Sequence, residues 1–160
     1  MAARTFKQDV AAIFGEAFSG LAAGADGTWF VQAGEAFFET LDRLDASQAS
    51  LAVAPGVNTI AAHVIHTAYY IELAIAVFNG NELPGDWPGS WKKQTVTEGE
   101  WAEVKATLHE RVSSFLQTLD AVDLAAGPYL QADAIANAAH AAYHLGAVRQ
   151  LYLIVTSDKP

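Results

Sequence analysis

The segment 59–79 constrains the fold more than any other part of the chain, because its apolar side chains point in almost every direction of a helical wheel. A helix of this kind packs against neighbours on several sides and occupies the middle of a helical assembly. Buried polar groups need hydrogen-bonding partners or a ligand. The strongly polar or amphipathic side chains of this segment are His63, His66, Tyr69, Tyr70 and Glu72.

Four further segments repeat their apolar residues at the helical spacing of three and four, and no strand-like alternation competes with this pattern. They are residues 5–21, 28–44, 98–122 and 132–155. Thr97 and Glu100 have the spacing of a capping box at the start of the third of these segments. We therefore expect an all-α protein with a single domain over residues 1–160, built as a four-helix bundle.

Two segments, at residues 5–21 and 82–99, lie outside the four helices of the expected bundle. The short helix at 5–21 is expected to be additional to the bundle, within an N-terminal segment of residues 1–24. The long connection at 82–99 contains Trp87 and Trp91, which are rarely left in water, so we expect it to be ordered and to cover a cavity. Its length also allows it to cross from one end of the bundle to the other.

Two histidines near the end of the chain have the spacing of a metal clamp. His140 and His144 lie four residues apart in an alanine-rich run, so a helix places both rings on one face, one turn apart. Asn137 shares this face, as do apolar residues that make it the inward one. Pairs with this spacing also occur without a metal, and a second histidine pair elsewhere favours the metal site.

That second pair is His63 and His66, which lie about 60° apart on the wheel of the apolar helix. Either could face the same cavity as His140 and His144, and three imidazoles leave an open position on a divalent ion, as in a catalytic site. The spacing alone leaves open which of the two is the third ligand. We interpret the remaining histidine, His109, as a surface residue.

Composition limits the chemistry and the partners. The chain has no cysteine, so histidine and carboxylate are the metal ligands that it can offer. A net charge of -9 disfavours nucleic acids and anionic membranes. Polar residues interrupt every apolar run before the roughly 18 residues of a membrane span, so we expect a cytoplasmic protein. With 52% hydrophobic and 17% charged residues, we expect a homodimer that hides apolar surface.

Three motifs together resemble the DinB-like superfamily of damage-inducible and YfiT-type proteins. They are Thr59-Ile-Ala-Ala-His-Val-Ile-His66, Asp86-Trp87 followed by Trp91 and Trp101, and His140-Ala-Ala-Tyr-His144-Leu-Gly-Ala-Val-Arg-Gln150. The resemblance covers residues 29–153 and implies an up-down-down-up four-helix bundle that holds a divalent metal, often zinc or nickel. It assigns the metal to His66, His140 and His144, with His63 as the alternate ligand.

The resemblance also implies an activity. Characterised relatives include transferases and isomerases that use low-molecular-weight thiols such as bacillithiol or mycothiol, and metal-dependent hydrolases have been proposed. A bound cation would lower the pKa of a thiol or of water at its open position. We therefore expect a metal-dependent S-transferase or hydrolase that acts on a small molecule. The alternative is a non-catalytic, stress-related bundle that binds a metal or an apolar ligand.

Two further residues are candidates to orient a ligand or a bound water molecule. Tyr70 lies one turn after His66, and Asn137 lies one turn before His140. Each could equally be a residue of the core. The chain departs from the family pattern in its extra N-terminal helix and in Asn58, which stands where relatives have tryptophan. Because of these departures, the substrate of this protein does not follow from those of the relatives.

Overall fold

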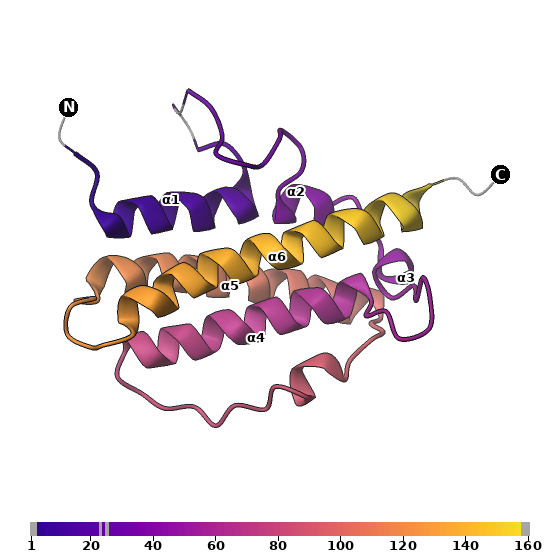
Figure 1. The fold of residues 1–160 in the computed structure, drawn as a ribbon. Helices are drawn as coiled ribbons and strands as arrows, with labels where there is room; N and C mark the ends of the chain where they lie inside the picture. The colour runs from indigo at the N-terminus through magenta and orange to yellow at the C-terminus, as the bar shows by residue number, and fades with distance from the viewer. Residues whose placement is uncertain (1–2, 23, 25, 158–160) are drawn as a thin grey trace.

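The computed structural model describes residues 3–22, 24 and 26–157, and over these residues the protein is all-helical. The elements are α1 (Phe6–Ser19), α2 (Phe37–Leu41), α3 (Ala46–Ala49), α4 (Ile60–Phe78), the short 3₁₀ helix η1 (Gly89–Trp91), α5 (Glu98–Ala121) and α6 (Leu130–Thr156). Four of them, α1, α4, α5 and α6, are long and lie side by side (Figure 1). The expected all-α four-helix bundle is confirmed.

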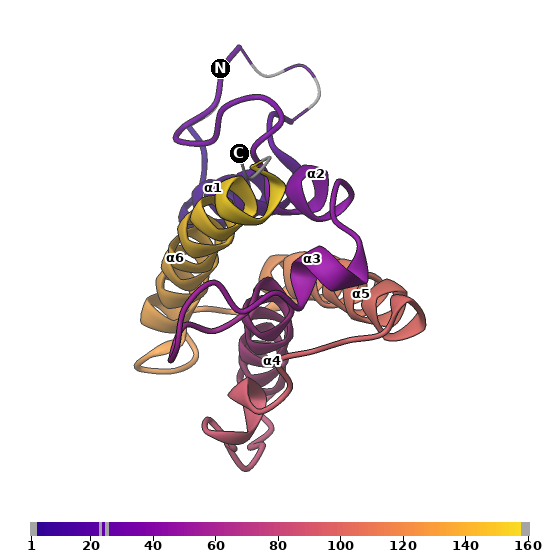
Figure 2. The same ribbon diagram turned by 90° about the vertical axis from the view of Figure 1, so that its right-hand side faces the viewer.

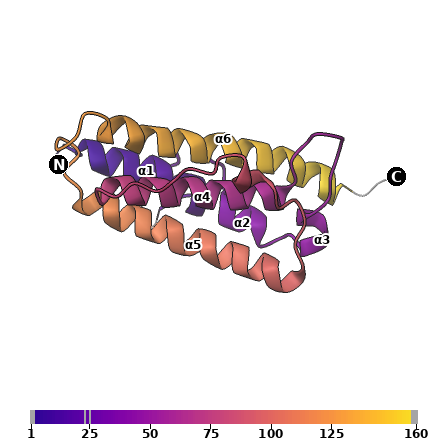
Figure 3. The same cartoon turned by 90° about the horizontal axis from the view of Figure 1, so that it is seen from below.

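The four long helices have the up-down-down-up order. Along the chain, α1 and α6 run in one direction and α4 and α5 in the opposite direction (Figure 1). Seen end-on, α4 lies beside α5 and α6, and α1 lies across the bundle from α4 (Figure 2). Because α4 and α5 are parallel, the chain between them has to travel back along the bundle. Residues 79–97, which we call the crossover connection, do this along the outer side of α4 (Figure 3).

The prediction of a helix over residues 28–44 was wrong. In its place the chain forms an irregular segment followed by the five-residue helix α2, and the four-residue helix α3 begins beyond residue 44. Gly34 has a φ of 81°, in the left-handed region, where a right-handed helix cannot continue. The helix at the N-terminus, expected to be additional, is therefore the fourth long helix of the bundle, and α1 packs on both α5 and α6.

A buried carboxylate determines the shape of the segment before α2. Glu16 projects from α1 and accepts hydrogen bonds from three consecutive backbone N–H groups, those of residues 29–31, at 2.6–2.8 Å. Desolvation by burial raises the pKa of Glu16, but the three hydrogen bonds outweigh it and lower the pKa below 4.5. Because these N–H groups donate to the Glu16 carboxylate, they do not form the backbone hydrogen bonds of a helix.

Aromatic side chains join α1 to the other elements in the core. The ring of Phe14 lies 4.3 Å from that of Phe115 in α5, and the ring of Phe18 stacks on Phe37 of α2 at 5.1 Å. All four rings are fully buried. Packing of this kind contributes a large share of the apolar burial that stabilises a bundle of this size.

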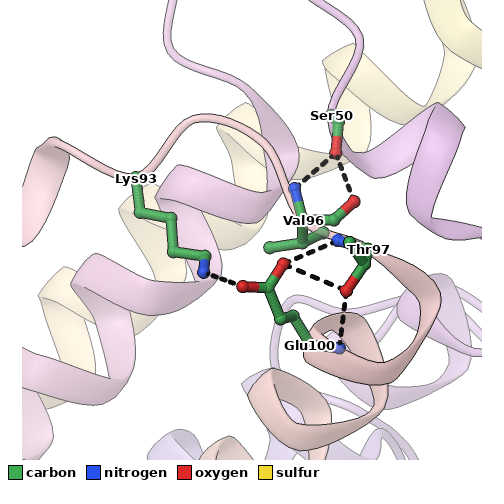
Figure 4. A network of polar contacts seen from close by, with 5 residues as sticks. All are labelled: Ser50, Lys93, Val96, Thr97 and Glu100. Atoms are coloured by element: carbon green, nitrogen blue, oxygen red, sulfur yellow. Dashed lines mark hydrogen bonds and ion pairs between the residues drawn. The ribbon is translucent and has the colours of Figure 1, made fainter.

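Threonine caps and side-chain hydrogen bonds hold the crossover connection at its C-terminal end. The predicted capping box of Thr97 and Glu100 is confirmed at the start of α5, and Lys93 pairs with the Glu100 carboxylate at 2.6 Å (Figure 4). Ser50 accepts a hydrogen bond from the Val96 N–H at 2.9 Å in the same network. This end of the connection is thereby fastened to α5 and to the residue that ends α3.

The helix α4 is more apolar than the sequence analysis expects of any segment in this chain. Ile60–Phe78 is long and apolar enough to cross a membrane by length and composition, although the sequence was interpreted as having no such segment. More than half of its most apolar window is buried against other parts of the protein, as for the core helix of a soluble protein. This position agrees with the central place that the apolar wheel of residues 59–79 predicts.

We predict that Glu16→Gln will destabilise the protein by about 1–3 kcal/mol, because the amide presents an N–H group to backbone donors that need an acceptor. Chemical denaturation at neutral pH measures this difference. The pKa of Glu16 is lower in the folded state than in the unfolded state. Its contribution is therefore complete above pH 4.5 and is lost as the pH falls through the folded-state value.

Glu103→Gln is the matched control, because Glu103 is exposed and its replacement removes the same charge. Equal stability of the two variants, or an equal dependence of their stability on acid, would show that the Glu16 carboxylate does not hold residues 29–31.

Candidate metal centre

Two adjacent helices supply four histidines to one side of the bundle. His63 and His66 project from the first two turns of α4, whose start is fixed by Thr59 as its N-cap. His140 and His144 project from the middle of α6, which runs antiparallel to α4. The histidines of α4 therefore face those of α6 across the seam between the helices, although the chain separates them by more than seventy residues.

Three ring nitrogens converge at this seam. His66 Nε2 lies 3.2 Å from His140 Nε2, and His140 Nε2 lies 3.0 Å from His144 Nε2. One ligand atom from each of the three residues lies within 4.8 Å of the other two. Among the described residues, this is the group of histidine or carboxylate side chains that is arranged to hold a metal ion. The structure thus brings together His66, His140 and His144, the three residues that the family resemblance assigns to the metal.

This donor set fits a divalent cation. A tetrahedral ion with metal–nitrogen distances of about 2.0–2.1 Å holds its ligand nitrogens about 3.3 Å apart, close to the separations found here. Nitrogen lone pairs that face one another at such distances repel unless a proton or a cation lies between them. Three imidazoles also suit zinc, nickel and similar ions, whereas magnesium and calcium prefer oxygen ligands.

Burial keeps the histidines neutral. It lowers the pKa of His66 to about 4, with His63 adding to the effect. It lowers the pKa of His140 to about 4, with a contribution from His66, and that of His144 to about 3, with contributions from His140, His63 and His66. Burial also lowers the pKa of His63. At neutral pH the rings therefore carry free lone pairs, which a metal ligand requires.

Hydrogen bonds fix two of the rings from behind. The Nδ1 atom of His66 lies 2.8 Å from the hydroxyl oxygen of Ser90, in the crossover connection. The Nδ1 atom of His144 lies 2.9 Å from Nδ1 of His63. In both cases the bonded nitrogen is the one that faces away from the cluster of Nε2 atoms, as is usual for metal-binding histidines.

Aromatic rings cover the cluster. Trp91 stacks on His66 with a centroid distance of 3.9 Å, and Tyr70 stacks on His140 at 3.8 Å. Trp87 meets His66 edge-on at 4.8 Å, although 46% of Trp87 is exposed. His66 and His144 are buried, whereas His140 is half-buried, so His140 is the most accessible of the three rings.

Of the two residues predicted to orient a ligand, Tyr70 contacts the histidine cluster and Asn137 forms its hydrogen bond within its own helix. Tyr70 contacts a predicted ligand through the stacking just described, and burial raises its phenol pKa, with a further contribution from Asp133. Asn137 is buried, but its Nδ2 donates to the Asp133 carbonyl of its own helix, and its Oδ1 is a buried atom without a partner among the described residues.

His109 and Arg149 interact with residues outside the histidine cluster. His109 is exposed, as predicted, and its ring stacks on Phe38 with centroids 3.5 Å apart. The side chain of Arg149 is 17% exposed and forms an ion pair with Glu35 at 2.7 Å. Neither His109 nor Arg149 forms part of the group of close ligand atoms at the seam.

Sequence reasoning missed Ser90. No periodicity or motif marks a serine in a connection, and the contact with His66 follows from the path of the crossover connection. The available signal was the segment itself, since two tryptophans flank Ser90 and predict that the connection is packed against the bundle.

The family model of the DinB superfamily matches residues 30–148, which include all four clustered histidines. No curated protein and no solved structure matches the chain. Since the matched region covers well over half of the chain, the protein belongs to the DinB superfamily.

Proposed function

We propose that the protein is a divalent-metal-dependent enzyme in which His66, His140 and His144 hold zinc or nickel. The observation that carries this proposal is that the Nε2 atoms of His66 and His144 lie 3.2 and 3.0 Å from Nε2 of His140. Membership of the DinB superfamily supports it, as does the nitrogen-only donor set. Three protein ligands leave a position for a substrate, in contrast to a four-ligand structural site.

His63 supports the site in this proposal without binding the cation. Its Nδ1 atom is taken up by the contact with His144, and it lies outside the group of mutually close ligand atoms. A neutral His144 that binds through Nε2 carries its proton on Nδ1 and donates it to His63. This arrangement favours the alternative in which His63 orients a ligand over the one in which it is a ligand itself.

The chemistry that fits this site is transfer of a low-molecular-weight thiol to an electrophilic carbon, or hydrolysis. When bound, the cation supplies Lewis acidity that lowers the pKa of a thiol or water. The chain has no cysteine, so the thiol has to come from a second small molecule. The rings of Tyr70 and Trp87 contact His140, the half-buried ring of the cluster, where they would limit the entry of bulk water and offer an apolar surface to a substrate.

The alternative is a bundle that binds a metal without turnover. The observation that favours it is the close aromatic cover, since Trp91 and Tyr70 stack directly on two of the rings and leave little room above them. A measurement of substrate turnover by the metal-loaded protein distinguishes the enzyme from the binding protein.

A homodimer and a cytoplasmic location also belong to this proposal. The exposed face of α6 runs from Gln131 to Ile154 without a charged residue, and it includes Ile135, Tyr143 and Leu153, each more than half exposed. In a chain with a net charge of -9, a second copy approaches with least repulsion along such a face. The packing of α4 inside the bundle supports a soluble protein.

We predict that the protein purified without chelator or histidine tag contains near-stoichiometric zinc or nickel. His140→Ala and His144→Ala should abolish tight binding, because each removes a ligand from the buried cluster. His66→Ala should be next in severity and His63→Ala weaker. Metal content by mass spectrometry tests this order, and His109→Ala is the matched control. Equal metal in the wild type and the His140/His144 double variant would exclude the site.

We predict that the metal-loaded protein turns over an electrophile in the presence of a low-molecular-weight thiol, or hydrolyses an activated ester or amide. Chromatographic detection of the adduct or of the hydrolysis product measures this. Loss of turnover in His144→Ala, with retention in His109→Ala, is the expected pattern. Stoichiometric metal without turnover in either assay would favour the binding function.

We predict that light scattering at micromolar concentration gives twice the chain mass of 17.0 kDa. The Ile135→Glu/Leu153→Glu variant should be monomeric, because each substitution places like charges opposite each other in a symmetric interface. Val57→Glu is the control, since Val57 is an exposed apolar residue outside α6. A monomeric wild type would contradict the dimer.

A further inference from the structure

Ser90 forms a directional chain of hydrogen bonds that ends at His66. Its hydroxyl oxygen lies 2.7 Å from the Trp87 carbonyl oxygen and 2.8 Å from His66 Nδ1. A carbonyl oxygen can only accept, so the single hydroxyl proton of Ser90 is donated to Trp87. Towards His66 the hydroxyl can then only accept, and the proton of that hydrogen bond belongs to His66 Nδ1.

The second nitrogen of His66 is determined by the first. An imidazole that carries its one proton on Nδ1 has a free lone pair on Nε2. This Nε2 atom is the one that lies 3.2 Å from His140 Nε2. We infer that Ser90 is a positioning residue that holds His66 in the tautomer required of a metal ligand, and thereby makes cation affinity depend on the crossover connection. This inference rests on the proposed metal site.

The other two ligand rings are held in less specific ways. His144 meets His63 through two Nδ1 atoms, and either nitrogen can be the donor. His140 is held by stacking on Tyr70, which orients the ring plane without selecting a tautomer. The contact of His66 with Ser90 is therefore the one whose proton position follows from the bonded atoms alone.

The connection is built to keep Ser90 in place. Ser90 lies in η1 and is 9% exposed, and its neighbour Trp91 stacks on the ring that Ser90 binds. The turn before it is closed by Asp86, which accepts a hydrogen bond from the Gly89 N–H at 2.9 Å. A Cβ atom at Gly89 would lie 1.9 Å from an Asp86 carboxylate oxygen, so a larger residue there would displace the side chain that closes the turn.

A second set of hydrogen bonds fastens the residues after Ser90 to the start of α4. Gln94 accepts from the Thr59 N–H at 3.0 Å and donates to the Asn58 side chain and to the Trp91 carbonyl, at 2.8 and 2.7 Å. The helix that carries His66 and the turn that carries Ser90 are thus held in register.

The test compares Ser90→Ala with Ser50→Ala. Ser90→Ala removes the acceptor from His66, and zinc affinity, measured by competition with a chromophoric chelator, should fall roughly tenfold to 100-fold. Ser50→Ala removes hydrogen bonds to Val96 of the same connection (Figure 4) and leaves the contact with His66 intact. Zinc affinity should be unchanged in this control. Ser90→Thr retains the hydroxyl and should restore most of the affinity.

Nitrogen-15 chemical shifts of the metal-free protein give a readout that is independent of zinc. In the wild type, in Ser50→Ala and in Ser90→Thr, His66 should be protonated on Nδ1 alone. In Ser90→Ala both tautomers should be populated. A single Nδ1–H tautomer together with unchanged zinc affinity in Ser90→Ala would overturn the inference, as would an equal loss of affinity in Ser50→Ala.

The two proposals fail in different ways. A wild type that binds no zinc removes the proposed function, and the tautomer measurement then decides by itself whether Ser90 fixes His66. A wild type that binds zinc as tightly as Ser90→Ala retains the proposed function and excludes the positioning role.

Discussion

The desolvation of four imidazole rings at the seam between α4 and α6 is the constraint on which the site depends. Burial holds these rings neutral, and each neutral ring has one nitrogen that donates and one that accepts. With Nδ1 of His66 and of His144 each engaged in a hydrogen bond, the Nε2 atoms are directed towards one another. An assembly of acceptors in an apolar seam is costly unless a cation or a proton occupies it, and this cost is the physical basis for proposing a metal.

The direction of the helices explains how the site is completed. Because α4 and α5 are parallel, the connection between them has to return along the bundle, and it runs beside α4 (Figures 1 and 3). Its residues Ser90 and Trp91 contact His66 at the histidine seam. An up-and-down bundle with short turns would leave the seam open. Here the returning chain places Trp87, Ser90 and Trp91 on the ligand rings, so the topology supplies part of the site.

Much of this arrangement follows from the sequence, and what does not has identifiable causes. Apolar periodicity predicts α4, α5 and α6 to within about two residues, and the spacing of His140 and His144 predicts a shared face. Periodicity failed at residues 28–44, because a carboxylate distant in the chain, that of Glu16, binds the backbone there. The contact of Ser90 with His66 depends on a tertiary path that local patterns do not encode.

The separation of the ligands along the chain has a consequence for folding. Glu16 and the backbone that it binds are 13–15 residues apart, so α1 and the segment before α2 can organise locally. The histidine contacts between α4 and α6 span 74 and 81 residues, and they close a long loop at a high cost in chain entropy. Before α6 docks on α4, His66 is separated from His140 and His144, so neither helix alone offers the three ligands. Cation binding would therefore come late in folding and would act as a check on it, because only the fully assembled bundle can retain the ion.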